Sequence, residues 1–243
     1  MILVAVQCRL ASARLPGKAL FPLGRESLPL VAWTLRAMKR VPADAYWLAC
    51  DTASYDTLQP IAYNQGWNCF AGPEDNVLER FCLLAQKTGA DVIVRATADN
   101  PFLFYEAAQA SVKEFLRRTC DYFTYTGLPH GSGIEVLSAR ALIEAHKRTR
   151  DAFECEHVGP ALYNHKDTYT CIFEPAPSEW NYPHLRTTVD TADDYRNACR
   201  VCSFLEQRFF AGQKEVPPYT ACSIVEAVQN KSPQTCGADG EKR

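Results

Sequence analysis

The sequence has no surplus of charge of one sign. Its 26 Lys and Arg side chains stand against 28 Asp and Glu, so the formal net charge is -2 over 243 residues. A chain without an overall positive field has no general attraction for nucleic acid, and any cationic site must be local. Long apolar runs are missing too: none approaches the roughly 18 residues of a membrane span, and the apolar start, residues 1–6, is too short for a signal peptide. We therefore expect a cytoplasmic protein whose partners are neither nucleic acid nor membrane.

The cysteines cannot form a complete set of disulfides, because there are eleven of them and an odd number leaves one unpaired. Several lie inside apolar runs, where a thiol behaves as a small hydrophobic side chain: Cys50, Cys69, Cys82, Cys120 and Cys171. We expect them to be reduced. Cys199 and Cys202 form the one close pair, but no second pair stands at the spacing of a zinc ribbon. A helix face is the favoured interpretation of this pair, and metal binding is the alternative.

Length and composition indicate one globular domain. The chain has a mass of 27.2 kDa, with 47% hydrophobic and 22% charged residues, which suits a single core. We assign residues 1–230 to this domain. The end of the chain, residues 231–243, is polar and interrupted by Gly and Pro, and it is predicted to be a disordered tail.

The first half of the chain alternates short apolar stretches, typical of strands, with stretches of helical periodicity. Strands are predicted at 2–7, 45–51, 67–72 and 91–99, and helices at 29–40, 53–66, 74–89 and 106–119. Strand alternating with helix predicts a parallel sheet covered by helices on both faces. We therefore predict an α/β fold with a doubly wound, mostly parallel sheet.

The alternation changes after residue 121, and inserted strands are expected in the second half. The segment 122–138 has two extended pieces around a Gly- and Pro-rich loop, and strand-like runs follow at 168–176 and 185–190. Helices are predicted near 139–149, 154–164 and 192–210. Because no linker composition separates the halves, the second half is interpreted as an extension of the same sheet.

The loop after the first strand, RLASARLPGKAL from Arg9 to Leu20, concentrates positive charge in Arg9, Arg14 and Lys18. In open parallel sheets, ligands bind beyond the carboxyl ends of the strands, which is where this loop lies. Its Gly and Pro shape a turn whose backbone amides can face an anion. The loop is neither a P-loop nor a G-x-G-x-x-G motif, because it lacks their glycines. It predicts a phosphate site of another kind, and a solvated basic loop is the alternative.

Two aspartates end later strands of the predicted sheet. Asp99 ends the stretch VIVRATAD, and Asp190 ends LRTTVD. Both carboxylates are expected at the same edge of the sheet as Lys18, where two hard oxygen ligands would hold Mg²⁺ together with water and phosphate oxygens. This combination predicts phosphoryl or nucleotidyl transfer. The alternatives are helix caps, with Asp99 capping the next helix and Asp190 or Thr191 capping the helix near 192.

RLASARLPGKAL and the following PLVAWTLRAMKR resemble the opening signature of the sugar-acid cytidylyltransferases, the family of the CMP-acylneuraminate and CMP-octulosonate synthetases. The resemblance extends more narrowly to the spore coat polysaccharide branch, the SpsF-like proteins, in GPEDNVLERF, DVIVRATADNPFL, HGSGIEVLSARAL, CEHVGPALY and LRTTVDTADDY. The similar segments run in order from Val4 to about Tyr195. The resemblance implies a Rossmann-like sheet of the GT-A nucleotidyltransferase type.

The resembled family transfers CMP from CTP to the hydroxyl of an acidic sugar and releases pyrophosphate, so the resemblance implies this reaction for surface polysaccharide or glycan biosynthesis, with Mg²⁺ as cofactor. The family's triphosphate-binding loop corresponds to Arg9, Ser12, Arg14 and Lys18. Arg14 and Lys18 are the implied catalytic groups, which would stabilise charge on the leaving pyrophosphate. Asp99 and Asp190 correspond to the family's magnesium ligands.

Arg95 departs from the resembled synthetases, which have a glutamine at the end of that strand. We place Arg95 among the nucleotide-binding residues, and the alternatives are a bidentate contact to an additional acidic group of the acceptor or an ion pair with Glu135. His130, Glu135 and His157 are the candidates for the acceptor pocket. His157 also fits a structural role, and His130 also fits a flexible loop.

Two other functions stay open from the sequence. One is a glycosyltransferase with a similar nucleotide-binding fold, which would consume an activated sugar rather than make one. The other is a nucleotide-binding protein without turnover. A homodimer is also expected, because members of the resembled family often pair through their inserted strands and YFTYTGLP carries aromatic side chains suited to an interface.

Overall fold

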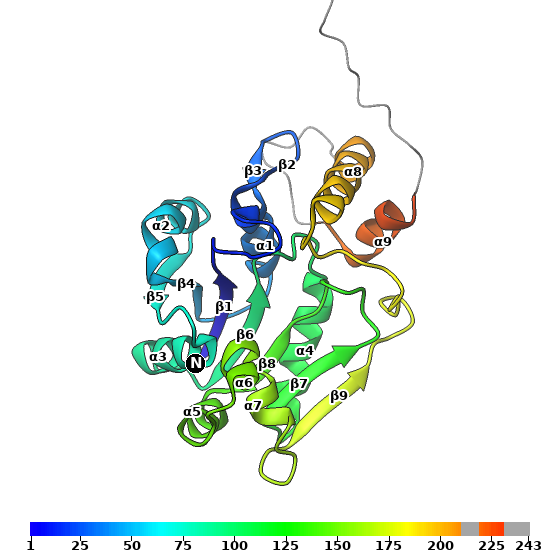
Figure 1. The fold of residues 1–243 in the computed structure, drawn as a ribbon. Helices are drawn as coiled ribbons and strands as arrows, with labels where there is room; N and C mark the ends of the chain where they lie inside the picture. The colour runs from blue at the N-terminus through cyan, green and yellow to red at the C-terminus, as the bar shows by residue number, and fades with distance from the viewer. Residues whose placement is uncertain (210–218, 231–243) are drawn as a thin grey trace, which may run out of the picture.

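The computed structural model describes residues 1–209 and 219–230 (Figure 1), so the tail expected over 231–243 lies outside the described residues. A seven-stranded sheet with the order β5-β4-β1-β6-β8-β7-β9 forms the centre. Its strands are β1 (Ile2–Cys8), β4 (Ala45–Asp51), β5 (Asn68–Gly72), β6 (Val92–Thr97), β7 (Tyr122–Thr126), β8 (Glu135–Ser138) and β9 (Cys171–Pro175). A small separate hairpin joins β2 (Pro22–Leu23) to β3 (Leu28–Pro29), and the sequence pattern did not predict it.

The pairing confirms a mostly parallel sheet with inserted strands. β1 lies between β4 and β6 and is parallel to both, and β4 is parallel to β5. The inserted strands follow β6 in the sheet. β8 lies next to β6 and is antiparallel to both β6 and β7, and β9 pairs in parallel with β7 at the edge. β1 and β6 are therefore direct neighbours, and their carboxyl ends open at the same edge of the sheet.

Helices cover both faces of the sheet, as predicted (Figure 1). Side chains alternate along a strand, so neighbouring residues of β1 enter different cores. Val4 and Val6 pack in a core with α1 (Leu30–Met38), α2 (Tyr55–Asn64) and α4 (Tyr105–Arg117). Leu3 and Ala5 pack in the opposite core with α3 (Val77–Thr88), α5 (Ala139–Arg148) and α7 (Pro160–Tyr163).

A third core extends the molecule beyond the sheet. It joins α8 (Ala192–Phe209) and α9 (Ala221–Gln229) to Trp33 of α1 and to Phe102 and Phe104, which follow β6. The long helix α8 was predicted, whereas α9 was not. None of the helices within residues 1–209 and 219–230 combines the length and the apolar character that a membrane span requires.

The strand predicted at 185–190 is wrong. This segment forms only an isolated bridge, between His130 and Arg186. Its successive amides donate to different segments: Thr187 and Thr188 to the carbonyl of His130, at 2.8 and 3.2 Å, and Val189 to the carbonyl of Asp99 at 2.9 Å. A strand ladder needs one continuous partner. Segment 185–190 is instead fixed between two loops.

The helix predicted at 154–164 is divided in two. α6 (Ala152–His157) ends at Val158, which has the positive φ of 69° and ψ of -66°, and α7 begins at Pro160. The amide of Gly159 donates to the carbonyl of His157 at 2.8 Å, which closes a three-residue turn. This turn is a strained backbone conformation for a β-branched residue such as valine. It ends α6 directly after His157.

Gly131 holds the loop that accepts segment 185–190. Its φ is +99°, and a Cβ atom there would lie 2.5 Å from the amide nitrogen of Thr188. We predict that Gly131→Ala lowers the free energy of unfolding by about 3 kcal/mol, because it adds backbone strain and overlaps a packed backbone. Gly89→Ala is the matched control, with φ +70° and no atom within 4 Å of the new Cβ, and should cost about 1 kcal/mol. Urea unfolding measures both, and equal losses would contradict the assigned role of Gly131.

Candidate functional site

The cation-bearing loop 9–20 is held in shape by hydrogen bonds around Leu10. The carbonyl of Leu10 accepts from the amides of Ser12 and Gly17, both at 3.0 Å, and its amide donates to the hydroxyl of Ser54 at 3.0 Å. That hydroxyl donates in turn to Asp51, the last residue of β4, at 2.7 Å. Gly17 has a φ of 69°, which turns the chain into the short helix η1 (Lys18–Leu20). The loop is thus anchored to the ends of two neighbouring strands.

The Lys18 ammonium group joins the two aspartates that end the predicted strands. Nζ lies 2.7 Å from Oδ2 of Asp99 and 2.9 Å from Oδ1 of Asp190, and it also donates to the carbonyl of Val189 at 2.7 Å. The Lys18 side chain is only 10% exposed. Residues that are 81 and 172 positions apart in the chain therefore meet at one point, as predicted, although Asp190 reaches this point from a loop and not from the end of a strand.

Asp190 is surrounded by cations. Its Oδ1 accepts from Nη2 of Arg14 at 2.8 Å as well as from Lys18, while Oδ2 accepts from Nη2 of Arg186 at 2.9 Å. Burial of the carboxyl group raises its pKa, but the hydrogen bonds and charges of Lys18, Arg186 and Arg14 together hold the pKa below its ordinary value. Asp190 is therefore ionised at neutral pH.

Neither aspartate caps a helix, whereas the alternative in which Thr191 caps the helix near 192 is confirmed. α4 begins at Tyr105 with Phe104 as its N-cap, so Asp99 does not cap it. At the start of α8, the hydroxyl of Thr191 accepts from the amide of Asp194 at 3.2 Å, and the Asp194 carboxylate accepts from the amide of Thr191 at 3.0 Å. This reciprocal pair caps α8, so the Asp190 side chain takes no part in the cap and bonds to the surrounding cations instead.

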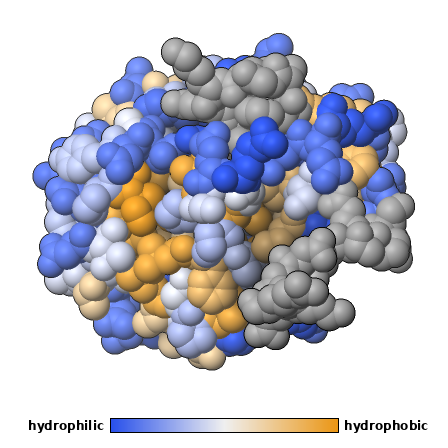
Figure 2. All heavy atoms as spheres, turned by 90° about the horizontal axis from the view of Figure 1, so that it is seen from above, coloured by the Kyte–Doolittle hydropathy of each residue, from blue (hydrophilic) through white to orange (hydrophobic). Residues whose placement is uncertain are grey.

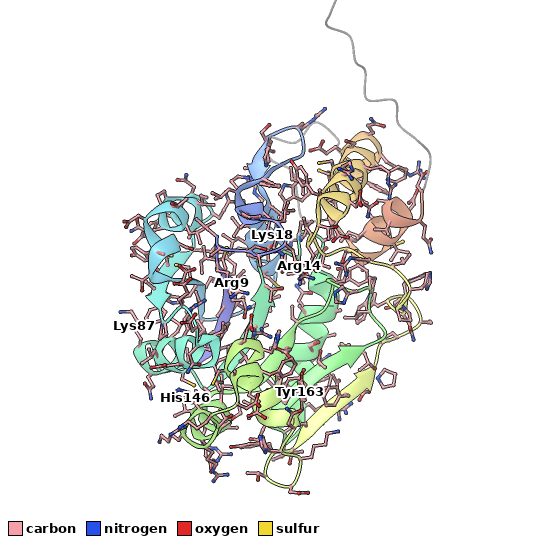
Figure 3. The ribbon with its side chains drawn as sticks, viewed as in Figure 1. Arg9, Arg14, Lys18, Lys87, His146 and Tyr163 are labelled. Atoms are coloured by element: carbon pink, nitrogen blue, oxygen red, sulfur yellow. The ribbon has the colours of Figure 1, made fainter. Side chains whose placement is uncertain are left out.

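A cavity of 330 Å³ lies below the loop, between the carboxyl ends of β1 and β6 and the helix α6. Figure 3 shows Arg9, Arg14 and Lys18 gathered above these strand ends. Figure 2, which views this end of the molecule, shows hydrophobic residues in the middle of the face with hydrophilic residues around them. The predicted residues that line the cavity are Arg9, Ser12, Arg14, Lys18, Arg95, Asp99 and His157.

Arg9 and α6 meet across the cavity. Nη2 of Arg9 lies 3.0 Å from Oε1 of Glu156, and each of these side chains is 48% exposed. The neighbouring His157 lines the cavity, and its ring lies against Phe153 with a centroid distance of 4.3 Å. The strained turn at Val158 therefore places two polar side chains of α6 opposite the cationic loop.

Arg95 forms the ion pair with Glu135 that the sequence offered as an alternative. Nη1 of Arg95 bonds to Oε2 of Glu135, and Nε donates to Oε1 of Gln7 at 2.9 Å. The Tyr122 hydroxyl donates to Oε1 of Glu135 at 2.9 Å. A Cβ atom on Gly159 would overlap this carboxylate, so the junction of α6 and α7 packs directly against it. Glu135 is not among the residues that line the cavity.

His130 lies apart from the cavity. It is exposed, and its backbone, rather than its ring, serves the site: its carbonyl accepts from the amides of Thr187 and Thr188 and its amide donates to Leu185 at 2.9 Å. His130 thus holds the segment that carries Asp190, and the lining of the 330 Å³ cavity does not include it.

Arg80 and Arg186 belong to the site although the sequence pattern did not predict them. Arg186 does so through its hydrogen bond to Asp190. Arg80 is 1% exposed, lines the cavity, and donates through Nε and Nη2 to the carbonyl of Pro73, at 3.1 and 2.5 Å. Burial lowers its pKa, although the group is an arginine. The sequence does contain a sign of this role. Arg80 lies within the apolar stripe of α3, three residues after Val77 and one before Phe81, and an arginine is rarely buried in a hydrophobic core without a specific partner.

The pair Asp99 and Asp190 fits a divalent cation. Their oxygens converge within 2.9 Å of one nitrogen, so both can contact a single small cation at that place. Hard carboxylate oxygens suit Mg²⁺, which takes few protein ligands and completes its shell with water and phosphate oxygens. No group of three or more His, Cys, Asp or Glu with metal-binding geometry occurs within the described ranges, so a closed, all-protein metal site is not available there.

A parallel sheet with an anchored cationic loop and two carboxylates at its carboxyl edge is the arrangement of a nucleotide-processing α/β enzyme. The chain belongs to the cytidylyltransferase family, whose model matches residues 3–214. The spore coat polysaccharide biosynthesis protein SpsF of Bacillus subtilis strain 168 is 32% identical over 202 residues, 81% of this chain and 84% of that protein. The resemblance inferred from the sequence motifs is thereby confirmed.

Solved structures share the fold at lower identity. A cytidylyltransferase from Leptospira borgpetersenii superposes with a TM-score of 0.81 at 22% identity, covering 96% of this chain and 98% of that one. A CMP:2-keto-3-deoxy-manno-octonic acid synthetase in complex with CTP gives 0.64 at 14% identity over 86% and 99%. A Mycobacterium tuberculosis protein in complex with manganese gives 0.58 at 15% identity over 82% and 97%. These neighbours confirm the nucleotidyltransferase-like fold.

Asp194 gives the site a pH-dependent contribution to stability. The hydrogen bond from Arg186 is the largest cause that holds its pKa well below the ordinary 3.8, and bonds from the amides of Asp190 and Thr191 act in the same direction. A carboxylate with a depressed pKa stabilises the fold above its unfolded pKa and loses that stabilisation as the pH falls. We predict that Asp194→Asn lowers the free energy of unfolding by about 1–2 kcal/mol at pH 7.

The difference between Asp194→Asn and the unmodified protein should shrink as the pH falls below about 3.9. Urea unfolding over a pH series measures it. Asp193→Asn is the control, because this neighbouring side chain is 84% exposed and forms a surface ion pair with Arg196. A loss for Asp194→Asn that does not change with pH would contradict the ionic account.

Proposed function

We propose that this enzyme transfers CMP from CTP to a hydroxyl of an acidic sugar with release of pyrophosphate, in a Mg²⁺-dependent reaction. The observation that carries the proposal is the meeting of Lys18, Asp99 and Asp190 beneath the cationic loop. A polyanion bound by the loop would place its phosphates next to the two carboxylates. Membership of the cytidylyltransferase family supports cytidine as the base.

The loop supplies the cations for the triphosphate. The side chains of Arg9 and Arg14 are 48% and 67% exposed, so both can turn toward a ligand at small cost. The hydroxyl of Ser12, which lines the cavity, adds a donor beside the same space. We assign Arg9, Ser12, Arg14 and Lys18 to the β- and γ-phosphates.

In the proposed reaction, the acceptor hydroxyl oxygen attacks the α-phosphorus, the bond from that phosphorus to the bridging oxygen of pyrophosphate breaks, and the hydroxyl proton passes to solvent. Arg14 and Lys18 stabilise the charge that develops on the leaving pyrophosphate, and one such contact is worth about 3 kcal/mol of the barrier. Asp99 and Asp190 would hold Mg²⁺, which supplies Lewis-acid neutralisation of the phosphate oxygens.

The acceptor is proposed to bind along the wall formed by Gln7, Arg95 and His157. Glu135 already neutralises Arg95, so we propose that Arg95 orients Gln7 rather than capturing a second acidic group. Glu135 then acts through Arg95, and His130 through the segment that carries Asp190. The relation to a spore coat polysaccharide biosynthesis protein supports a product used in surface polysaccharide. The homodimer expected from the sequence stays a prediction.

The activity is tested by release of pyrophosphate from CTP and Mg²⁺ across a panel of ulosonic and related acidic sugars. We expect turnover with at least one acceptor, and CTP bound more tightly than CMP in calorimetry, because the loop addresses the β- and γ-phosphates. The absence of pyrophosphate with every acceptor, together with equal affinities for CTP and CMP, would contradict the proposal and favour a glycosyltransferase.

Asp99→Asn tests the role of the first carboxylate. It should reduce kcat by about 10²- to 10³-fold with the fold intact, since it removes one of two charges that meet the metal and Lys18. The control is Asp167→Asn, an exposed aspartate in the turn before β9, at the amino end of the sheet and so away from the loop. Equal activity of Asp99→Asn and the control in the pyrophosphate assay would remove Asp99 from the mechanism.

A further inference from the structure

The Lys18 ammonium group uses all of its hydrogen-bond donors on the protein. A lysine ammonium has three N–H groups, and Lys18 directs them to Asp99, to Asp190 and to the carbonyl of Val189. All three contacts lie between 2.7 and 2.9 Å, and the side chain is 10% exposed. In this arrangement Lys18 has no donor left for a phosphate oxygen.

A metal ion at the point where the two carboxylates meet would contact the same two oxygens as Lys18. Oδ2 of Asp99 and Oδ1 of Asp190 both face Lys18. The other oxygen of Asp190 is not free, because Arg186 holds Oδ2 at 2.9 Å and is itself fixed by Asp194. A divalent cation placed between the carboxylates would therefore take the place of the ammonium group and be repelled by it.

We propose that Lys18 is a positioning residue in the nucleotide-free protein: its ammonium group stands in for the metal between Asp99 and Asp190, and the divalent cation enters together with the triphosphate, which draws Lys18 away. This proposal rests on the proposed function, since it names the order in which that site is filled. The stand-in prevents two neighbouring carboxylates from repelling each other while the site is without metal.

The chain offers a route for the exchange. Lys18 follows Gly17, and a Cβ atom added to Gly17 would have no other atom within 4 Å. The turn that carries the lysine is therefore not packed against the rest of the protein on the side of Gly17. The exposed side chain of Arg14 remains beside Asp190 and can guide phosphates into the space.

By linkage, the triphosphate must raise the affinity for the metal by the same factor as the metal raises the affinity for the triphosphate.

The test measures Mn²⁺ affinity from the electron paramagnetic resonance signal of free Mn²⁺, first without nucleotide. Lys18→Met removes the competing ammonium group and should bind Mn²⁺ about tenfold more tightly than the unmodified protein, a factor within the usual range of coupling between sites. The control is Lys87→Met, which removes an exposed lysine on the outer side of α3 (Figure 3) and should leave the affinity unchanged. Affinity for Mn²⁺ in Lys18→Met equal to or weaker than in the unmodified protein would overturn the proposal.

A second measurement keeps the test valid if Lys18→Met folds poorly without metal. In the unmodified protein Mn²⁺ alone should change Tm little, whereas in Lys18→Met, or in the milder Lys18→Gln, Mn²⁺ should raise Tm clearly. Equal shifts in all proteins would overturn the stand-in role.

A third measurement adds CTP to the unmodified protein and should raise Mn²⁺ affinity beyond that of Mn²⁺ for CTP alone. No gain with CTP would overturn the joint entry of metal and nucleotide. Failure of the proposed function is separate, because it would appear as the absence of CTP binding, while the comparison of Lys18→Met with the unmodified protein needs no nucleotide.

Discussion

The ion pairs of Lys18 with Asp99 and Asp190 tie together three segments that are far apart in the chain. The loop after β1 supplies the cation, the turn after β6 supplies one carboxylate, and the loop before α8 supplies the other. None of these segments is a regular strand or long helix at the point of contact. Their meeting therefore depends on the strands beneath them, where β1 and β6 are parallel neighbours.

Much of the remaining architecture holds this meeting in place. The loop before α8 is fixed by amides that donate to His130 and Asp99, and Gly131 allows the close approach of Thr188. On the other side of the cavity, the ion pair of Arg95 with Glu135 packs against Gly159 and fixes the end of α6. Two charged networks thus frame one cavity, and each is neutral within itself. In the first, Lys18, Arg14 and Arg186 pair with Asp99, Asp190 and Asp194, and in the second Arg95 pairs with Glu135.

The sequence predicted the sheet and the two aspartates well, because both follow from local rules. Apolar periodicity located β1, β4, β5 and β6, and the rule that parallel strands end at one edge brought Asp99 to Lys18. For Asp190 the predicted position was right, but the predicted strand was wrong. Its segment is not a strand and is held at the site by hydrogen bonds to two loops. Arg80, Arg186 and α9 were missed, because a buried arginine and a helix on an added core are decided by tertiary packing.

The most direct test is anomalous diffraction from crystals soaked with CTP and Mn²⁺, which locates the metal independently of activity. The account predicts one Mn²⁺ peak in contact with Oδ2 of Asp99 and Oδ1 of Asp190, with the triphosphate on the loop and the Lys18 ammonium group moved from the carboxylates to a phosphate. A Mn²⁺ peak elsewhere, with Lys18 still between the two aspartates while CTP is bound, would contradict it.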